Sequence, residues 1–220
     1  FITDTGVILT NAHVAQFLLL ESVPEAQGTT ECTIRSGNPA VPQYRAELLF
    51  ISPSWIFENA ELLSQEHPMG TGEYDYALLY ITSPLGENEL PPSFPSLPLY
   101  TDYLSRNYAG GEVVTAGYPA EKLIREGKNA TLTPESATTH IGELYTFHSN
   151  YADIFSVESS PVGEQGVSGG PVVKYPEGTI GLIVTKGDTD TDGEKSLRAL
   201  SLSYIDRTIQ EETGFSLRDN

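Results

Sequence analysis

The sequence predicts an all-β fold, a sandwich or a barrel, that ends in a C-terminal helix. Short strand-like runs separated by Gly, Pro, Asn and Asp fill most of the 220 residues, and many short strands with regular turn signals are typical of these architectures. A proline-rich stretch, 82–101, has the composition of a long connector and divides the strands into two groups of comparable size. Hydrophobic residues make up 39% of the chain, which is enough for a core at this length.

The first group contains four predicted strands and one predicted helix. The strands are bounded by turn residues and cover 6–10, 30–36, 44–51 and 75–82. The stretch 52–67 predicts a short helix. The apolar run 14–20 is the size of a core segment, and no apolar run approaches the roughly 20 residues that a membrane span needs.

The second group contains more strands and the closing helix. Residues 130–147 predict either two strands or one long bent strand. Apolar residues at helical spacing and a terminal Gly predict a helix over 203–214. The other predicted strands cover 112–118, 153–159, 170–175, 179–187 and 196–205.

The chain is strongly acidic, with 30 acidic against 12 basic residues and a net charge of −18. Such a field repels nucleic acid and anionic lipid, because no basic patch is available to displace counterions from phosphates. Cys32 is the only cysteine, so an internal disulfide is excluded and a small buried hydrophobic residue is expected there. The chain starts at Phe1 without a signal-peptide pattern and reads as an excised domain or a trimmed fragment.

One of the four histidines, His13, ends an apolar strand-like run, and this context suits the wall of a cleft. Asp75 directly precedes the apolar run "YALLYI". Burying a carboxylate there costs several kcal/mol unless a partner such as a histidine N–H compensates it. Each residue also has a simpler interpretation, His13 as a satisfied core residue and Asp75 as a turn residue.

Ser168 lies in "GVSGGP", between glycines and just before a run of valines. The backbone N–H groups of Gly166 and Ser168 can point at one spot beside the hydroxyl, which is the geometry that stabilises a tetrahedral oxyanion. A serine becomes a nucleophile at neutral pH when a base takes its proton and a third group orients that base. Taken alone, the glycine-rich stretch is equally consistent with a simple turn.

The motifs "TNAHV", "DYALL" and "GVSGGPVV" follow one another in the order His, Asp, Ser, with separations of 62 and 93 residues. That order distinguishes chymotrypsin from subtilisins and α/β-hydrolases. On these motifs the sequence resembles the chymotrypsin-like (trypsin superfamily) serine endopeptidases over nearly all of its length. It is most similar to the disulfide-free bacterial members of the HtrA type.

The resemblance implies two six-stranded antiparallel β-barrels, the first one N-terminally truncated, with a C-terminal helix. Residues 1–100 are expected to hold the incomplete first barrel and the connector, and 101–220 the second barrel and the helix. Together they form one peptidase domain whose cleft holds His13, Asp75 and Ser168 as the catalytic triad. Disulfide-free relatives often work outside the cytoplasm, so an extracytoplasmic location, periplasmic or secreted, is expected.

The resemblance also implies substrate-binding positions. Thr185 aligns with the position whose backbone pairs with substrate and whose hydroxyl supports the aspartate, and Lys186 and Gly187 line the entrance of the specificity pocket. Val162 falls at the pocket floor, which predicts an apolar residue before the cleaved bond. Val167 replaces the aspartate that pairs with a freshly cut N-terminus in zymogen-activated relatives, so cleavage does not switch this loop on.

Three functions are consistent with these patterns. The first is peptide-bond hydrolysis through an acyl-enzyme, with a protein or peptide substrate, no cofactor and no metal. The second is a dormant protease fold kept for binding, suggested by Val167 and the truncated N-terminus. The third is a calcium-dependent surface domain, suggested by the acidic loop 188–194, whose spacing lacks the expected Glu because that position is Ala199. The sequon at 129–131 is unspecific, and the oligomeric state is not predicted.

Overall fold

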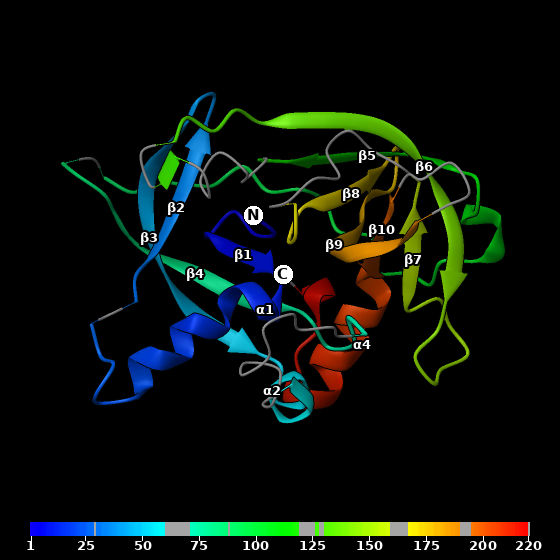
Figure 1. Cartoon of the computed structure of the whole chain (residues 1–220), viewed down its shortest axis with the longest axis horizontal. Coiled ribbons are helices and arrows are strands. Elements are labelled where there is room, and N and C mark those ends of the chain that lie inside the picture. Colours follow the sequence, from blue (N-terminus) through cyan, green and yellow to red (C-terminus); the bar gives the residue numbers. More distant parts are fainter. Residues whose placement is uncertain are drawn as a thin grey trace.

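The protein is described from a computed structural model of the whole chain. It describes residues 1–28, 30–59, 71–87, 89–118, 126–127, 130–158, 167–189 and 195–219. Two antiparallel sheets lie side by side (Figure 1), one an open sheet of four strands and the other a closed barrel of six strands. This architecture confirms the predicted all-β fold with a full second barrel and an incomplete first one.

The first sheet has the strand order β1-β4-β3-β2. Its strands are β1 (Val7–Thr10), β2 (Cys32–Gly37), β3 (Ala40–Ile51) and β4 (Ala77–Pro84). All three pairings are antiparallel, and in one of them Thr10 lies opposite Ala77. Because β1 ends where β4 begins, the chain that leaves β1 and the chain that enters β4 share one edge of the sheet.

The second sheet closes in the order β10-β7-β6-β5-β8-β9. Alternate residues of its strands fill an apolar interior that includes Ile141, Phe155 and Ile183. The stretch 130–147 holds one long strand rather than two, β6, which covers Glu135–Tyr145 and whose register against β7 shifts between Ile141 and Leu144. The strands are β5 (Glu112–Gly117), β6 (Glu135–Tyr145), β7 (Ile154–Val157), β8 (Pro171–Lys174), β9 (Gly178–Thr189) and β10 (Lys195–Ser201).

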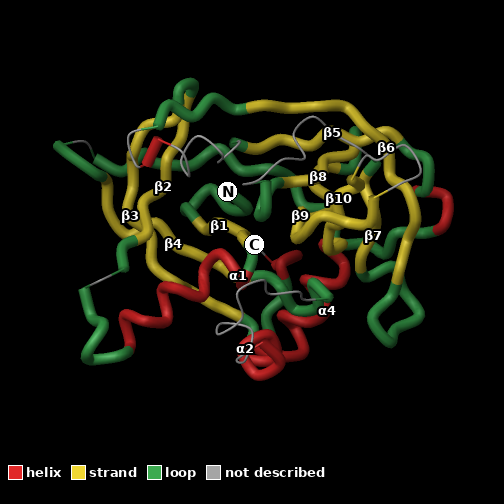
Figure 2. Tube along the Cα trace, viewed as in Figure 1, coloured by secondary structure: helices red, strands yellow, loops and turns green. Residues whose placement is uncertain are grey.

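Helices α1, α2 and α4 lie in the lower part of Figure 2, where they are drawn in red. The predicted closing helix is α4 (Leu202–Thr213), and Gly214 ends it with a φ of 80°. The strand predicted over 196–205 stops at Ser201, because the Ser201 hydroxyl oxygen accepts the N–H of Tyr204 and caps α4. The helix predicted within 52–67 is α2 (Pro53–Asn59), and the residues after it lie outside the described part.

The apolar run 14–20, which has the size of a core segment, is only partly buried. It forms the end of α1 (Ala12–Ala15) and most of the 3-10 helix η1 (Gln16–Ser22), and Val14, Phe17 and Leu20 are exposed. Only part of the run, Leu18 and Leu19 among it, packs against the core of the first sheet. Two further 3-10 turns are η3 (Arg106–Tyr108) and η5 (Leu217–Asp219).

A shared hydrophobic cluster joins the two sheets and α4. Leu9 and Tyr76 reach it from the first sheet, Leu182 and Val184 from the barrel, and Ile205 from α4. Because these side chains are buried together, the ends of β1 and β4 are held in a fixed place relative to the barrel. Within the described residues, no helix has both the length and the apolar character that crossing a membrane requires.

Candidate active site

His13 and Asp75 form a close pair at the edge of the first sheet. Nδ1 of His13 lies 2.6 Å from Oδ2 of Asp75, and the backbone N–H of His13 donates to Oδ1 at 2.9 Å. The Asp75 side chain is only 8% exposed, whereas the His13 side chain is 39% exposed. The carboxylate is therefore bound through both oxygens to one residue, and the imidazole reaches solvent beyond it.

The strand register explains why residues 62 positions apart meet. Thr10 pairs with Ala77, so α1 leaves the sheet beside the chain that enters β4. His13 lies in the first turn of α1 and not in the strand itself, which places its ring over Asp75. The sequence places both residues at strand ends, and the antiparallel pairing brings those ends together.

Asn11 is a buried residue that binds the backbone of Asp75. It is fully buried, and its side-chain amide donates to the backbone carbonyl of Asp75 at 3.0 Å. Its carbonyl oxygen Oδ1 is buried without a hydrogen-bond partner among the described residues. The sequence gives one signal of this role, because an amide inside an apolar strand end needs a buried partner.

Ser168 occupies the second position of a tight turn that leads into β8. The N–H of Gly170 donates to the carbonyl of Val167 at 2.9 Å, and Gly169 at the third position has a φ of 84°. This turn needs glycine there because other residues are strained at positive φ. The N–H of Gly169 donates to the carbonyl of Ile183, and the N–H of Ile183 donates to the carbonyl of Gly170, each at 2.9 Å, which attaches the turn to β9.

The Ser168 turn abuts the end of β1. A Cβ atom added to Gly169 would lie 2.9 Å from Oγ1 of Thr10 and 3.8 Å from Oδ1 of Asn11. Figure 1 shows the chain entering β8 (yellow) beside the end of β1 (blue). The serine turn thus lies next to the residues that lead into His13, although no hydrogen bond joins the His13 ring to the Ser168 hydroxyl within the described residues.

The remaining predicted site residues are only partly described. Gly166 and Val162 lie outside the described residues. Thr185, Lys186 and Gly187 belong to β9, where Thr185 pairs with Arg198 and Lys186 with Leu197 of β10. Their assignment to substrate binding, like the roles of the triad, stays a prediction.

Residues 190–194 of the acidic loop and Asn129 of the sequon also lie outside the described part of the chain. Among the residues that the structure describes, no group of three His, Cys, Asp or Glu side chains is placed to hold a metal ion. Cys32 is half-buried against the core of the first sheet rather than fully buried, and burial raises the pKa of its thiol.

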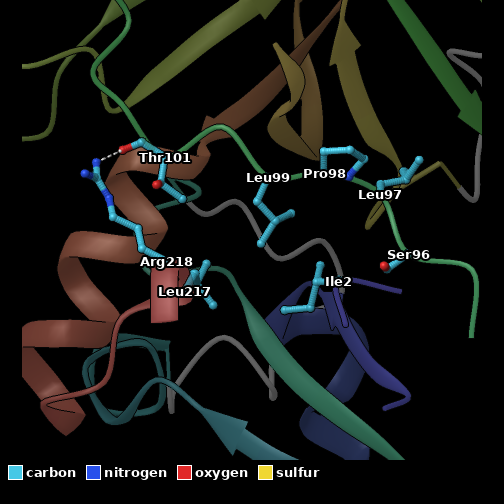
Figure 3. Close-up of a pocket in the computed structure, with 8 residues that line it drawn as sticks. All are labelled: Ile2, Ser96, Leu97, Pro98, Leu99, Thr101, Leu217 and Arg218. Carbon is cyan, nitrogen blue, oxygen red and sulfur yellow. Dashed lines mark hydrogen bonds between the residues drawn. The ribbon is translucent and has the colours of Figure 1, made fainter. Parts of the chain in front are cut away.

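A pocket of about 410 Å³ lies on the connector, between its residues and both chain ends (Figure 3). Ile2, Leu99 and Leu217 supply apolar walls, while Arg218 closes one side by donating to the carbonyl of Thr101 at 2.7 Å. None of the predicted site residues lines this pocket. It is therefore separate from the group formed by His13, Asp75 and the Ser168 turn.

Three solved structures with a similar fold are described as proteases or as a paralogue of one. The active form of the protease Rv3671c from M. tuberculosis matches with a TM-score of 0.54 and 18% identity, over 97% of this chain and 72% of that chain. The MamO protease domain from Magnetospirillum magneticum matches with a TM-score of 0.52 and 12% identity, over 93% of this chain and 82% of that one. The scabies mite inactivated protease paralogue S-I1 matches with a TM-score of 0.53 and 21% identity, over 96% and 84% of the two chains.

These identities establish a common fold and no more. No curated protein sequence matches the chain significantly. The family model of the trypsin-like peptidase domain, however, matches residues 1–182, which include His13, Asp75 and Ser168. The chain belongs to the trypsin-like peptidase family.

Proposed function

We propose that the protein is a serine endopeptidase with His13, Asp75 and Ser168 as its catalytic triad. The observation that carries this proposal is the 2.6 Å contact between Nδ1 of His13 and the shielded carboxylate of Asp75. The serine turn beside the end of β1 supports it, because Gly169 packs on Thr10, three residues before His13. A base oriented by a buried acid, with a half-buried serine nearby, is the arrangement that acyl transfer needs.

Each residue has one task in the proposed reaction. Ser168 Oγ attacks the peptide carbonyl while Nε2 of His13 accepts its proton, and Asp75 stabilises the imidazolium through Nδ1–H. His13 then protonates the leaving amine, which leaves an acyl-enzyme on Ser168. A water molecule, deprotonated by His13, releases the acid and restores the serine. We assign the oxyanion to the backbone N–H groups of Gly166 and Ser168.

The substrate side of the proposal rests on the family and on the position of Val167. A trypsin-like peptidase acts on proteins or peptides, and a valine at 162 favours an apolar residue before the cleaved bond. Val167 is 5% exposed and packs in the core of the barrel. Zymogen-activated relatives have an aspartate at this position that forms an ion pair, whereas Val167 makes apolar contacts instead. The loop is therefore set by folding rather than by N-terminal cleavage. An HtrA-type subtype and an extracytoplasmic location remain proposals from the resemblance.

A dormant protease fold is the second candidate function. The scabies mite inactivated paralogue has a similar fold at a TM-score of 0.53, so this fold is also found in a protein described as inactivated. The described residues also hold no hydrogen bond between the His13 ring and the Ser168 hydroxyl. In this alternative the serine is not activated, and substrates are bound without being cleaved.

Replacement of the nucleophile separates the two candidates. We expect Ser168→Ala to lower peptide turnover at least about 10,000-fold, because a triad without its serine keeps only the oxyanion and binding contributions. The measurement is cleavage of a fluorogenic peptide library, with labelling by a fluorophosphonate probe as a readout that needs no substrate.

The matched control is Ser22→Ala, which removes an exposed hydroxyl bonded only locally to the carbonyl of Leu19. It is expected to keep the rate and the labelling of the wild type. Equal turnover by wild type and Ser168→Ala, or a wild type that neither cleaves nor labels, would reject the peptidase and favour the binding module.

A further inference from the structure

The backbone turn that carries Asp75 is held in a conformation that its own sequence disfavours. The N–H of Asp75 donates to the carbonyl of Gly72 at 3.2 Å, which closes a four-residue turn. Its third residue is Tyr74, whose φ is 54°, in the left-handed region that favours glycine and asparagine. A bulky aromatic residue persists there only when its surroundings enforce the conformation.

Tyr204 of α4, which lies far from Tyr74 in the sequence, contacts Tyr74 and holds it in this conformation. Its phenol oxygen accepts the backbone N–H of Tyr74 at 3.2 Å, and the two rings lie 6.0 Å apart. Tyr204 is 2% exposed, and Phe147 packs on its ring at a centroid distance of 5.3 Å. Burial raises the pKa of Tyr204 far above its usual range, so the hydroxyl stays neutral at every working pH.

The rest of the turn also rests on the second half of the chain. A Cβ atom on Gly72 would lie 3.3 Å from Cγ2 of Val184 and 3.6 Å from Cδ1 of Ile154, both residues of the barrel. On its other side, the N–H of Tyr76 donates to the carbonyl of Tyr74 at 2.7 Å. Asp75 therefore connects a turn that packs against the barrel to β4 of the first sheet.

We propose that Tyr204 is a positioning residue for the catalytic acid. Its hydroxyl holds Tyr74 in the left-handed conformation, and that conformation directs both carboxylate oxygens of Asp75 to His13. The proposal rests on the proposed triad, because it assigns a function to the orientation of Asp75. Tyr204 lies 130 positions from Tyr74 and acts only through the backbone.

Tyr204→Phe tests the hydroxyl alone, because it keeps the ring. We expect kcat to fall about 10- to 100-fold, as a misplaced catalytic group does, while KM changes less than about twofold. The second readout is the downfield proton resonance of the short His13–Asp75 hydrogen bond in ¹H NMR at low pH, which should move or broaden. This signal needs neither substrate nor an intact Ser168.

Tyr145→Phe is the matched control, since it removes a tyrosine hydroxyl that donates to Glu143 at 2.9 Å, away from Asp75. It is expected to leave kcat and the NMR signal unchanged. A Tyr204→Phe variant with wild-type kcat and an unmoved signal, whatever its melting temperature, would show that the hydroxyl only stabilises the fold.

A double-mutant cycle with Tyr74→Asn tests the left-handed conformation itself. Asparagine adopts this region readily, so removing the Tyr204 hydroxyl is expected to change kcat less than about threefold in the Tyr74→Asn background. An equally large loss in both backgrounds would contradict the proposed route through Tyr74. If wild type shows no serine-dependent turnover, the peptidase proposal fails, whereas the NMR signal still decides whether Tyr204 orients Asp75.

Discussion

At Gly169 both the backbone conformation and the packing of neighbouring atoms exclude a side chain. Its φ is 84°, and an added Cβ would lie 2.9 Å from Oγ1 of Thr10. Both restrictions come from one arrangement, the Ser168 turn wedged between β1 and β9. The residue next to the proposed nucleophile therefore also sets the distance between the serine turn and the strand that leads into His13.

We expect Gly169→Ala to lower peptidase turnover more than about 10-fold and to destabilise the fold by more than the roughly 1–2 kcal/mol that a left-handed alanine costs. Fluorogenic peptide assays and urea unfolding measure the two effects. Gly86→Ala is the control, because Gly86 has a φ of 83° with nothing within 4 Å of an added Cβ. If both variants lose the same stability and neither loses activity, close packing on Thr10 has no catalytic consequence.

At the scale of elements, α4 is attached to the barrel by a shielded ion pair. Nη2 of Arg207 lies 2.7 Å from Oδ1 of Asp153, whose side chain is fully buried just before β7. The other oxygen of Asp153 accepts from the Ser149 hydroxyl at 2.6 Å and from the N–H of Phe147 at 2.8 Å. This carboxylate thus joins the loop between β6 and β7 to the helix that carries Tyr204.

Replacing Arg207 while keeping the buried carboxylate of Asp153 tests how much this ion pair stabilises the fold. Arg207→Met is expected to cost about 3–5 kcal/mol in the free energy of urea unfolding, because an unpaired buried charge remains. The combined variant Asp153→Asn with Arg207→Met should lose less than Arg207→Met alone. Arg45→Met breaks an exposed pair with Glu31 and should cost less than about 1 kcal/mol. A small loss in Arg207→Met would mean that water replaces the arginine.

The strands could be predicted from sequence because their alternation and turn residues are local signals. The environment of the segment after His13 could not be predicted, since an apolar run does not show that Phe17 and Leu20 face outward from a 3-10 helix. The residues of the proposed triad could be singled out from the sequence because polar groups of this kind are unusual beside apolar strands. Tyr204 was not, because its role depends on an atomic contact with a backbone N–H 130 residues away.

At the scale of the whole molecule, the net charge of −18 is a source of self-repulsion. Charges on a folded surface lie closer together than in an unfolded chain. Added salt screens that repulsion, since the Debye length falls from about 30 Å at 0.01 M to about 8 Å at 0.15 M. The folded state is therefore expected to gain from moderate salt.

We expect the melting temperature to rise by about 2–4 °C between roughly 10 and 150 mM NaCl, the shift that about 1 kcal/mol gives in a chain of this size. Differential scanning calorimetry measures it. The control is CaCl₂ at equal ionic strength, where a further rise would reveal a specific calcium site in the loop 188–194. An unchanged or lower melting temperature in NaCl would mean that attractive pairs outweigh the repulsion.

The turn of Gly72 and Tyr74 belongs to the N-terminal half of the sequence, yet its supports, Val184, Ile154 and Tyr204, belong to the C-terminal half. Any slippage of one half against the other disturbs the acid–imidazole pair while every strand keeps its own ladder of bonds. We therefore expect the proposed peptidase activity to be lost at a lower temperature or denaturant concentration than the fold itself.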